Sequence, residues 1–291
     1  FLLGGVNQKE EVKSMPGIFR WTLDLMLKEI ESCMKLGIHS FVIFPCFPDN
    51  VKDKYATLSY DNSNFYLDAL FKIKTLFPQS YIMTDVAMDP YSSDGHDGIV
   101  ENGKILNDET LEVLGKMTLA QAQTGVDAIG PSDMMDGRIG YLRSVLDEKG
   151  FTNTSIISYS AKYASAYYGP FRDALDSAPK FGDKKTYQMN PANAKEALLE
   201  ASLDFEEGAD ILMVKPALSY LDIIKSLNDN FDVPIAAYNV SGEYAMIKAA
   251  DEKGWIDGEK VMLETLLSMK RAGASIILSY HAKEFAQLHT K

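Results

Sequence analysis

The stretch that most constrains the fold is an apolar run, residues 211–214, that leads directly into Lys215 and Pro216. Four consecutive apolar residues predict a strand that is covered on both faces, as in a parallel sheet. Proline has no amide hydrogen for a sheet ladder, so we expect the strand to end at Lys215. This places Lys215 at the carboxyl end of a buried strand, where barrels and open α/β sheets carry their catalytic groups.

A lysine in that position has two interpretations. It can cap the strand and reach into solvent, which is the more common role of an isolated lysine before a proline. It can also lose its proton where water is excluded or a second cation is close, and the free amine then attacks carbonyl groups. The rest of the chain favours the second interpretation.

Composition narrows the class of protein. Of the 291 residues, 46% are hydrophobic and 24% are charged, as in a soluble globular enzyme. The formal net charge of -12 argues against nucleic acid or an anionic membrane as a partner, because both need a basic face. The two cysteines, Cys33 and Cys46, have no metal-type or redox spacing, which indicates buried thiols of an intracellular protein.

Strand and helix patterns alternate along the chain. The expected strands are 1–6, 39–44, 81–86, 126–130, 155–159, 211–215, 233–240 and 275–280. The expected helices are 21–36, 65–77, 107–124, 134–146, 192–207, 220–228, 242–253 and 257–271, with a further helix at the end. About eight strand-helix units without a linker predict one (β/α)₈ TIM barrel domain over residues 1–291. An open doubly wound sheet is the alternative.

Polar residues follow the strands at the points where they end. If the sheet closes into a barrel, these side chains lie around one rim, where barrel active sites are found. They are Asp85, Ser132, Asp133, Ser160, Lys162, Lys215, Ser241 and Tyr280. Two lysines in one pocket make protonation of each costlier, so one can be a neutral amine suited to imine chemistry on carbonyl substrates.

The segment 161–190 is long and rich in aromatic residues, which argues for function rather than disorder. We expect it to close over the pocket as a lid that excludes water. Its Arg172 and Lys184 are candidates for holding carboxylate groups of a substrate.

The loop after the strand at 81–86 gathers Asp85, Asp89, Asp94 and Asp97 around His96. Oxygen ligands of this kind suit Mg²⁺ and do not suit a thiolate-type zinc site. Acidic, glycine-rich loops are also common as plain turns, so this loop is compatible with Mg²⁺ or with no metal.

Several blocks identify a resemblance to a known family that covers nearly the whole chain. The blocks are SMPGIFR (14–20), TDVAMDPYSSDGHDG (84–98), GPSDMMDGRIG (130–140), SYSAK (158–162), MVKP (213–216) and VSGEYAM (240–246). In these blocks the chain resembles the 5-aminolevulinate dehydratase, or porphobilinogen synthase, family. The resemblance implies a (β/α)₈ barrel that condenses two 5-aminolevulinate molecules to porphobilinogen with loss of two waters, in tetrapyrrole biosynthesis.

The resemblance also implies roles for particular residues. Lys215 matches the lysine that forms a Schiff base with one substrate, and Lys162 matches the lysine that does so with the second. The other matches are Arg172, Lys184 and Gln188 for the second substrate, Ser241 and Tyr280 for the carboxylate of the first, and Asp85 and Ser132 in the pocket lining.

The chain departs from the zinc-dependent members of the family in its metal loop. Those members have three cysteines where this chain has Ala87, Asp89 and Asp97, so no catalytic zinc is expected. The resemblance is to the aspartate-type, magnesium-stimulated branch of bacteria and plastids, in which Glu200 matches a ligand of an allosteric Mg²⁺ at a subunit interface. Asp89 and Asp97 remain candidate metal ligands. A homo-octamer built from dimers is implied, clasped by an N-terminal arm that is largely missing here.

Two other functions fit parts of the pattern. A class I Schiff-base aldolase on the same barrel needs one lysine and a phosphate site after the last strands. The sequence around Ser241 and Tyr280 is poor in the glycines and cations of such a site. A barrel without catalytic activity would leave both lysines with ordinary pKa values.

Overall fold

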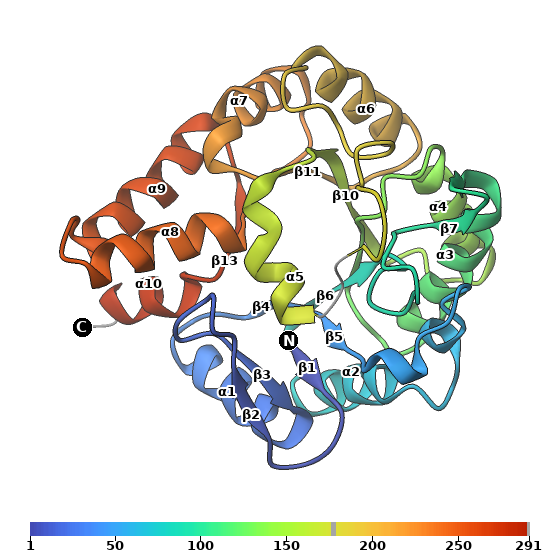
Figure 1. The fold of residues 1–291 in the computed structure, drawn as a ribbon, viewed down its shortest axis with the longest axis horizontal. Helices are drawn as coiled ribbons and strands as arrows, with labels where there is room; N and C mark the ends of the chain where they lie inside the picture. The colour runs from blue at the N-terminus through green and yellow to red at the C-terminus, as the bar shows by residue number, and fades with distance from the viewer. Residues whose placement is uncertain (176–178, 290–291) are drawn as a thin grey trace.

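A computed structural model describes residues 1–175 and 179–289 of the chain, and its helices surround a curled parallel sheet (Figure 1). The order of strands in this sheet is β13-β12-β11-β10-β9-β6-β4. The strands are β4 (Ser40–Ile43), β6 (Tyr81–Val86), β9 (Ala128–Pro131), β10 (Ser155–Lys162), β11 (Ile211–Lys215), β12 (Ile235–Asn239) and β13 (Ile276–Ser279). The α/β, TIM-barrel-like architecture expected from the sequence is confirmed.

The helices that follow the strands lie outside the sheet (Figure 1), and all of them except α10 carry buried side chains. They are α1 (Leu23–Lys35), α2 (Phe65–Leu76), α3 (Asn107–Ala122), α4 (Arg138–Glu148), α6 (Lys195–Glu206), α7 (Leu221–Asn230), α8 (Ser241–Glu252), α9 (Gly258–Ala272) and α10 (Ala282–His289). In α1 the buried residues Met26, Ile30 and Cys33 recur at the three- and four-residue spacing of one helix face. None of the helices among the described residues has the length and apolar character needed to cross a membrane.

The hydrogen-bonded parallel sheet of the described residues has seven strands, where about eight were expected. The run at 1–6 forms only the two-residue strand β1 (Leu2–Leu3), which pairs in parallel with β5 (Pro45–Cys46). β5 follows β4 directly along the chain. The pairing of β1 with β5 therefore extends the β4 edge of the sheet, but over two residues only. β1 pairs on its other side with β3 (Phe19–Thr22), which forms an antiparallel hairpin with β2 (Lys9–Glu11).

Three local predictions differ from the structure. The strand expected at 155–159 extends to Lys162, so this lysine lies within β10 and not after it. The helix expected to begin at Met134 begins at Arg138, because Met134 and Gly137 have positive φ angles of 69° and 71°. The acidic loop contains a hairpin of β7 (Ile99–Glu101) and β8 (Lys104–Leu106) that the sequence analysis did not anticipate.

Residues 176–178 of the expected lid at 161–190 lie outside the described residues. In the described part, the yellow-green helix α5 (Gly169–Leu175) crosses the mouth of the barrel (Figure 1). The short helix η3 (Ala166–Tyr168) precedes it. Gly242, at the start of α8, allows this segment to approach, because a Cβ there would lie 2.5 Å from the carbonyl oxygen of Tyr167. The other short helices are η1 (Asp49–Val51), η2 (Thr57–Tyr60) and η4 (Leu218–Tyr220).

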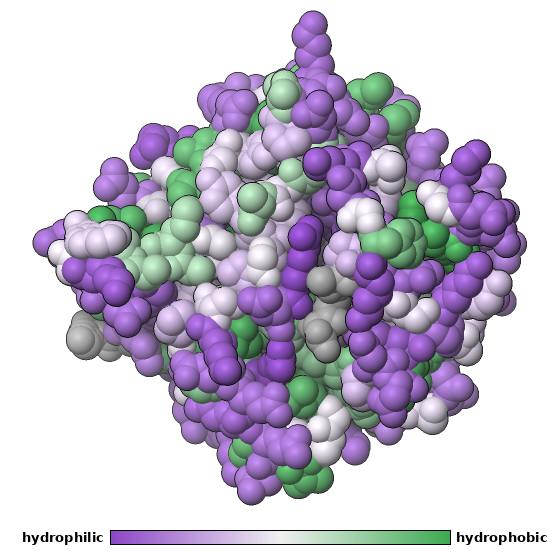
Figure 2. Space-filling view, in the orientation of Figure 1, coloured by the Kyte–Doolittle hydropathy of each residue, from purple (hydrophilic) through white to green (hydrophobic). Residues whose placement is uncertain are grey.

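Apolar side chains line the interior of the barrel and leave a cavity of about 650 Å³ there. Met83, Ile157, Met213 and Ala236, from β6, β10, β11 and β12, are buried in one cluster. Hydrophilic side chains cover much of the face that carries the barrel mouth (Figure 2). The polar groups described below therefore lie between an apolar interior and a solvated surface.

Candidate active site

Lys215 ends β11 inside a ring of aromatic side chains. Its Nζ lies 4.6 Å from the ring centre of Tyr238 and 5.0 Å from those of Tyr159 and Phe171. Tyr168 adds a fourth ring at 5.3 Å. The side chain is buried, so the aromatic faces replace water around the ammonium group.

Burial, together with the positive charge of Lys162, lowers the pKa of Lys215 to about 7, although Asp85, Asp89 and Asp97 act in the opposite direction. At pH 7 about half of such lysines carry a free amine, against roughly one in 3,000 for an ordinary lysine. Lys215 therefore has the chemical character that the sequence analysis expected of a nucleophilic lysine.

Lys162 lies beside Lys215 because the two residues are direct partners in the β10–β11 pairing. A shift in register between Ser158 and Ala161 brings Lys162 into this position. Its Nζ donates a hydrogen bond to the backbone oxygen of Ser132 and lies 3.8 Å from the Asp97 carboxylate. The two lysines predicted from separate strand ends therefore share one buried pocket.

Asp85 is the carboxyl group of the pocket that is best placed to exchange protons near neutral pH. Burial, together with the nearby Asp89 carboxylate, raises the pKa of Asp85 to about 7. Lys215 and Lys162 act in the opposite direction, and so does a hydrogen bond from the Ser132 side chain. Asp85 and Ser132 were both predicted to line the pocket, and the structure brings them together there.

Lys184 reaches from the lid to two carboxylates of the acidic loop. Its Nζ lies 2.9 Å from Asp97 Oδ1 and 3.3 Å from Asp89 Oδ2, and the side chain is buried. Burial alone would lower the pKa of Lys184, but the two carboxylates raise it. The pKa of Asp97 is lowered, since Lys184 and Lys162 outweigh the effect of burial. The two predicted metal-loop aspartates thus already share a cation.

His96 joins the acidic loop to the lid. Its Nδ1 lies 3.0 Å from the hydroxyl of Tyr187, and its Nε2 lies 3.1 Å from the backbone oxygen of Phe181. The Tyr187 hydroxyl also accepts a hydrogen bond from the backbone amide of Asp97 at 3.3 Å. These bonds fix the two segments between which Lys184, Asp89 and Asp97 meet.

Arg172 belongs to the lid helix α5. The Phe171 amide, one residue before it, donates to Ser241 Oγ at 3.0 Å, and this hydroxyl donates to the Tyr167 backbone oxygen at 3.2 Å. The positive charge of Arg172 opposes the rise in pKa that burial causes at the phenols of Tyr168 and Tyr187. Arg172 is therefore near the pocket. Ser241, at the start of α8, is hydrogen-bonded to the lid through Tyr167 and Phe171.

Tyr280 follows β13 at the opposite side of the pocket. Its hydroxyl lies 3.5 Å from that of Tyr238, whose ring faces Lys215. Burial raises the pKa of Tyr280, so the phenol stays a neutral hydrogen-bond donor at physiological pH. Gln188, the remaining predicted substrate contact, is buried at the end of the lid segment.

Glu200 lies apart from this pocket, on α6. It lines a cavity of about 950 Å³ together with Glu196, Asp136 and Tyr187. Burial raises the pKa of Glu200, and the negative charge of Asp204 raises it further. Across the described ranges, no group of three or more histidine, cysteine, aspartate or glutamate side chains is arranged to hold a metal ion.

Neither the aromatic cage around Lys215 nor the hydrogen bonds of the lid was predicted from the sequence. Tyr159 and Tyr238 lie within strands whose inward and outward positions alternate, so their direction was in principle readable from the strand pattern. The partners of His96 come from a segment about ninety residues away, and no spacing in the sequence indicates such a contact.

Comparison with known proteins gives consistent matches over almost the entire chain. The family model described as "Delta-aminolevulinic acid dehydratase" matches residues 1–288. The Delta-aminolevulinic acid dehydratase of Chlamydia pneumoniae is 53% identical, with 99% of this chain and 87% of the relative covered. The chloroplastic relative from Oryza sativa subsp. japonica is 54% identical over 95% of this chain, which spans 66% of the relative's length.

A solved structure matches equally well. The delta-aminolevulinic acid dehydratase (porphobilinogen synthase) of Toxoplasma gondii ME49, crystallised in complex with the reaction product porphobilinogen, superposes with a TM-score of 0.97. Its sequence is 47% identical, and the match covers 99% of this chain and 82% of that one. The similarity therefore extends through the barrel and the pocket.

Proposed function

Because the chain belongs to the delta-aminolevulinic acid dehydratase family, we propose that Lys215 and Lys162 each form a Schiff base with one 5-aminolevulinate molecule. The activity is that of a porphobilinogen synthase, a hydro-lyase of tetrapyrrole biosynthesis. The single observation that carries the residue assignment is the pairing of two buried lysines side by side, one of them with a pKa of about 7. A class I aldolase, the alternative weighed above, has no comparable support.

The first step follows from the state of Lys215. Its free amine attacks the ketone carbon of one substrate, and loss of water from the resulting carbinolamine gives the imine. The aromatic cage excludes water, which favours the neutral amine before attack and limits hydrolysis of the imine afterwards. Lys162 remains positively charged nearby and keeps the pKa of Lys215 low.

Lys162 binds the second substrate in the same way once it has lost its proton. Asp85, whose pKa is raised to about 7, is suited to accept that proton and to return it to a departing hydroxyl group. Each Schiff base releases one water as it forms, which accounts for the two waters lost per porphobilinogen. A carbon of the substrate on Lys162 then bonds to the imine carbon of the substrate on Lys215, and the Lys215 amine leaves. The amine of that substrate bonds to the imine carbon on Lys162 and displaces the Lys162 amine, which closes the ring and frees both lysines. Ser132 orients Asp85 through its side chain and Lys162 through its backbone oxygen.

The carboxylate tails of the two substrates have separate anchors in this proposal. Ser241 and Tyr280 hold the carboxylate of the first substrate. The neutral phenol of Tyr280 is a suitable donor, and the Ser241 hydroxyl turns its proton from the Tyr167 oxygen to the carboxylate. Arg172 and Lys184 hold the carboxylate of the second, and Gln188 lies beside them. An ammonium group has three hydrogens, and Asp89 and Asp97 take two from Lys184, so one remains for a substrate oxygen.

The metal assignment follows the chemistry of the donors. Asp89 and Asp97 already share the ammonium group of Lys184, and the loop supplies no thiolate, so these residues do not fit a catalytic zinc ion. Glu200 fits Mg²⁺ better, because burial and then the neighbouring carboxylates raise its pKa, and a divalent cation would relieve the repulsion among these carboxylates. We place the chain in the aspartate-type, magnesium-stimulated branch, with Glu200 as a ligand of an allosteric ion that stabilises the assembly.

The assembly in this proposal is a homo-octamer of single-domain barrels, built from dimers, in the bacterial cytoplasm or in a plastid. Leu199, Leu203 and Phe205 support an interface at α6, since they are 58%, 38% and 46% exposed on the helix that carries Glu200. An interface there would place the proposed Mg²⁺ between subunits.

Turnover by matched lysine variants tests the function. Wild-type protein should convert 5-aminolevulinate to porphobilinogen, measured by the colour reaction of the product. Lys215→Met and Lys162→Met should each lose at least a thousandfold in kcat, because each removes a covalent step. Lys225→Met, which changes an exposed lysine on α7, should retain wild-type turnover. Substantial turnover by either pocket variant would overturn the assignment.

A further inference from the structure

The N-terminal hairpin, here residues 9–22 with strands β2 and β3, is the one conspicuous sequence block without a role in the chemistry above. It packs into a small cluster of its own, separate from the barrel interior. Val12 and Met15 of the hairpin, Ala174 of α5 and Tyr244 of α8 are buried together there. Tyr280 packs against the same cluster. The hairpin therefore touches the lid helix and the pocket wall at once.

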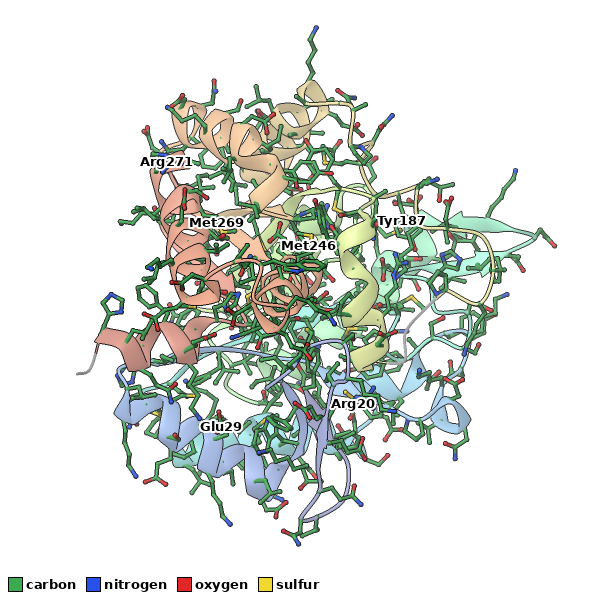
Figure 3. All side chains as sticks on the ribbon, turned by 60° about the vertical axis from the view of Figure 1, so that its left-hand side comes forward. Arg20, Glu29, Tyr187, Met246, Met269 and Arg271 are labelled. Atoms are coloured by element: carbon green, nitrogen blue, oxygen red, sulfur yellow. The ribbon has the colours of Figure 1, made fainter. Side chains whose placement is uncertain are left out.

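Arg20, at the end of the SMPGIFR block, makes the polar contact between hairpin and lid. Its Nε donates to the backbone oxygen of Ala174 at 2.7 Å, and its Nη2 donates to that of Asp173. These carbonyls belong to the last described turn of α5, and the Ala174 oxygen also accepts from Cys46 Sγ at 3.4 Å. Figure 3 shows Arg20 at the lower end of this yellow-green helix.

The second contact of Arg20 is much weaker. Its Nη1 lies 3.5 Å from Glu10 Oε2, and the Glu10 side chain is 53% exposed. A surface ion pair of this kind contributes little, whereas the planar guanidinium matches the two adjacent carbonyls with two parallel donors. The helix end is therefore the principal partner of Arg20.

The same helix places two groups at the pocket. Phe171 lies 5.0 Å from Lys215 Nζ and is tied by its amide to Ser241, and Arg172 is the next residue. In a helix of seven residues, fixing the last turn also fixes the first. We propose that Arg20 is a positioning residue, a latch by which the N-terminal hairpin holds α5 over the barrel mouth so that Phe171 and Arg172 stay in place for the reaction.

This inference rests on the proposed function only where it concerns catalysis, so the test has two independent measurements. The first is hydrogen exchange of the backbone amides of residues 171–175 in the full chain without substrate. The second is kcat and KM for 5-aminolevulinate. The variant is Arg20→Gln. The matched control is Arg143→Gln, since Arg143 also donates to two backbone carbonyls, those of Phe151 and Thr154, at the opposite end of β10.

Arg20→Gln should speed exchange in α5 at least tenfold and raise KM roughly tenfold, with a smaller change in kcat, because a charged donor pair to the helix end is lost. Arg20→Lys should show most of the same increase in exchange and in KM, since an ammonium group cannot place two parallel donors on the carbonyls of Asp173 and Ala174. Arg143→Gln should change neither quantity. Equal exchange and equal KM in the Arg20→Gln and Arg143→Gln proteins would overturn the latch.

Tyr244→Phe provides a second variant if Arg20→Gln does not fold. It removes the hydrogen bond from the Tyr244 hydroxyl to the Pro16 backbone oxygen, which seats the hairpin turn, and leaves Arg20 unchanged. Faster exchange in α5 would support the latch, and unchanged exchange would contradict it. If wild-type protein made no porphobilinogen, the proposed function would fail while the exchange measurement still decided the latch.

Discussion

Lys215 has an unusual pKa because of where its strand ends. The apolar run before it buries the side chain, Pro216 stops the strand, and Lys162 on the next strand adds a second positive charge. The sequence predicted each of these elements, since apolar runs and strand-ending prolines are local signals. The four aromatic rings around Lys215 were not predicted, because they come from two strands and the lid.

The low pKa of Lys215 has a direct consequence for the pH dependence of Schiff-base formation. A pKa of about 7 means that the free amine increases as the pH rises through 7, so the rate of imine formation should rise over the same range. Borohydride trapping of 5-aminolevulinate at Lys215, measured from pH 5 to pH 9, checks this.

Replacing the neighbouring charge provides the control for the pH profile. Lys162→Met should move the midpoint at Lys215 to higher pH, because the positive charge that opposes protonation is removed. An unchanged midpoint, or a wild-type midpoint near that of ordinary lysine, would show that charge coupling between the two lysines is absent.

Lys184 should matter for binding more than for the chemical step. Lys184→Ala removes a charged donor from the proposed carboxylate anchor and is expected to raise KM by about tenfold to a hundredfold. It also leaves Asp89 and Asp97 without their shared cation, so thermal stability should fall. Steady-state kinetics check the first effect, with Lys185→Ala, an exposed neighbour, as the control. A loss confined to kcat would contradict the anchor role.

At the scale of elements, the acidic loop and the lid depend on one another. The sequence predicted a lid from its length and aromatic content, but not the hydrogen bonds that join it to the loop. Such contacts arise from tertiary packing between segments far apart in the chain, for which a single sequence gives no signal.

The hydroxyl group of Tyr187 should therefore contribute to the stability of the folded state. Tyr187→Phe removes the hydrogen bonds with His96 and with the Asp97 amide, and should destabilise the folded state by about 1–3 kcal/mol. The same change should lower kcat/KM, since Lys184 lies between these two segments. Tyr141→Phe, on the exposed face of α4, is the control for denaturation and kinetics. Equal stability of the two variants would show that the hydroxyl of Tyr187 does not join loop and lid.

At the scale of the whole molecule, the strand and helix order was predictable because alternating apolar periods recur through the chain. The strand pairing near the N-terminus, by contrast, was not predictable from the sequence. The expected first strand is short, and β1 pairs with β5 and β3 over two residues each. The pairing of so short an element is set by its neighbours in the fold and not by its own sequence.

The proposed Mg²⁺ ligand should influence the assembly as well as the activity. Glu200→Gln should weaken the response to added Mg²⁺ after EDTA treatment, seen as a smaller mass by light scattering and a smaller gain in turnover. Glu206→Gln, an exposed glutamate on the same helix, is the control. An equal Mg²⁺ response in both variants would rule out Glu200 as the ligand, and restoration of EDTA-treated wild-type protein by zinc alone would contradict the magnesium assignment.

The central claim is that two neighbouring lysines form Schiff bases in one pocket, and reduction of the enzyme with borohydride in the presence of 5-aminolevulinate tests it most directly. Peptide mass spectrometry should find the reduced adduct at Lys215 in wild-type protein, with Lys162 as the second site at high substrate concentration. Lys215→Met should carry no adduct at position 215 and should make no porphobilinogen. An adduct on another lysine, or turnover by Lys215→Met, would contradict the account.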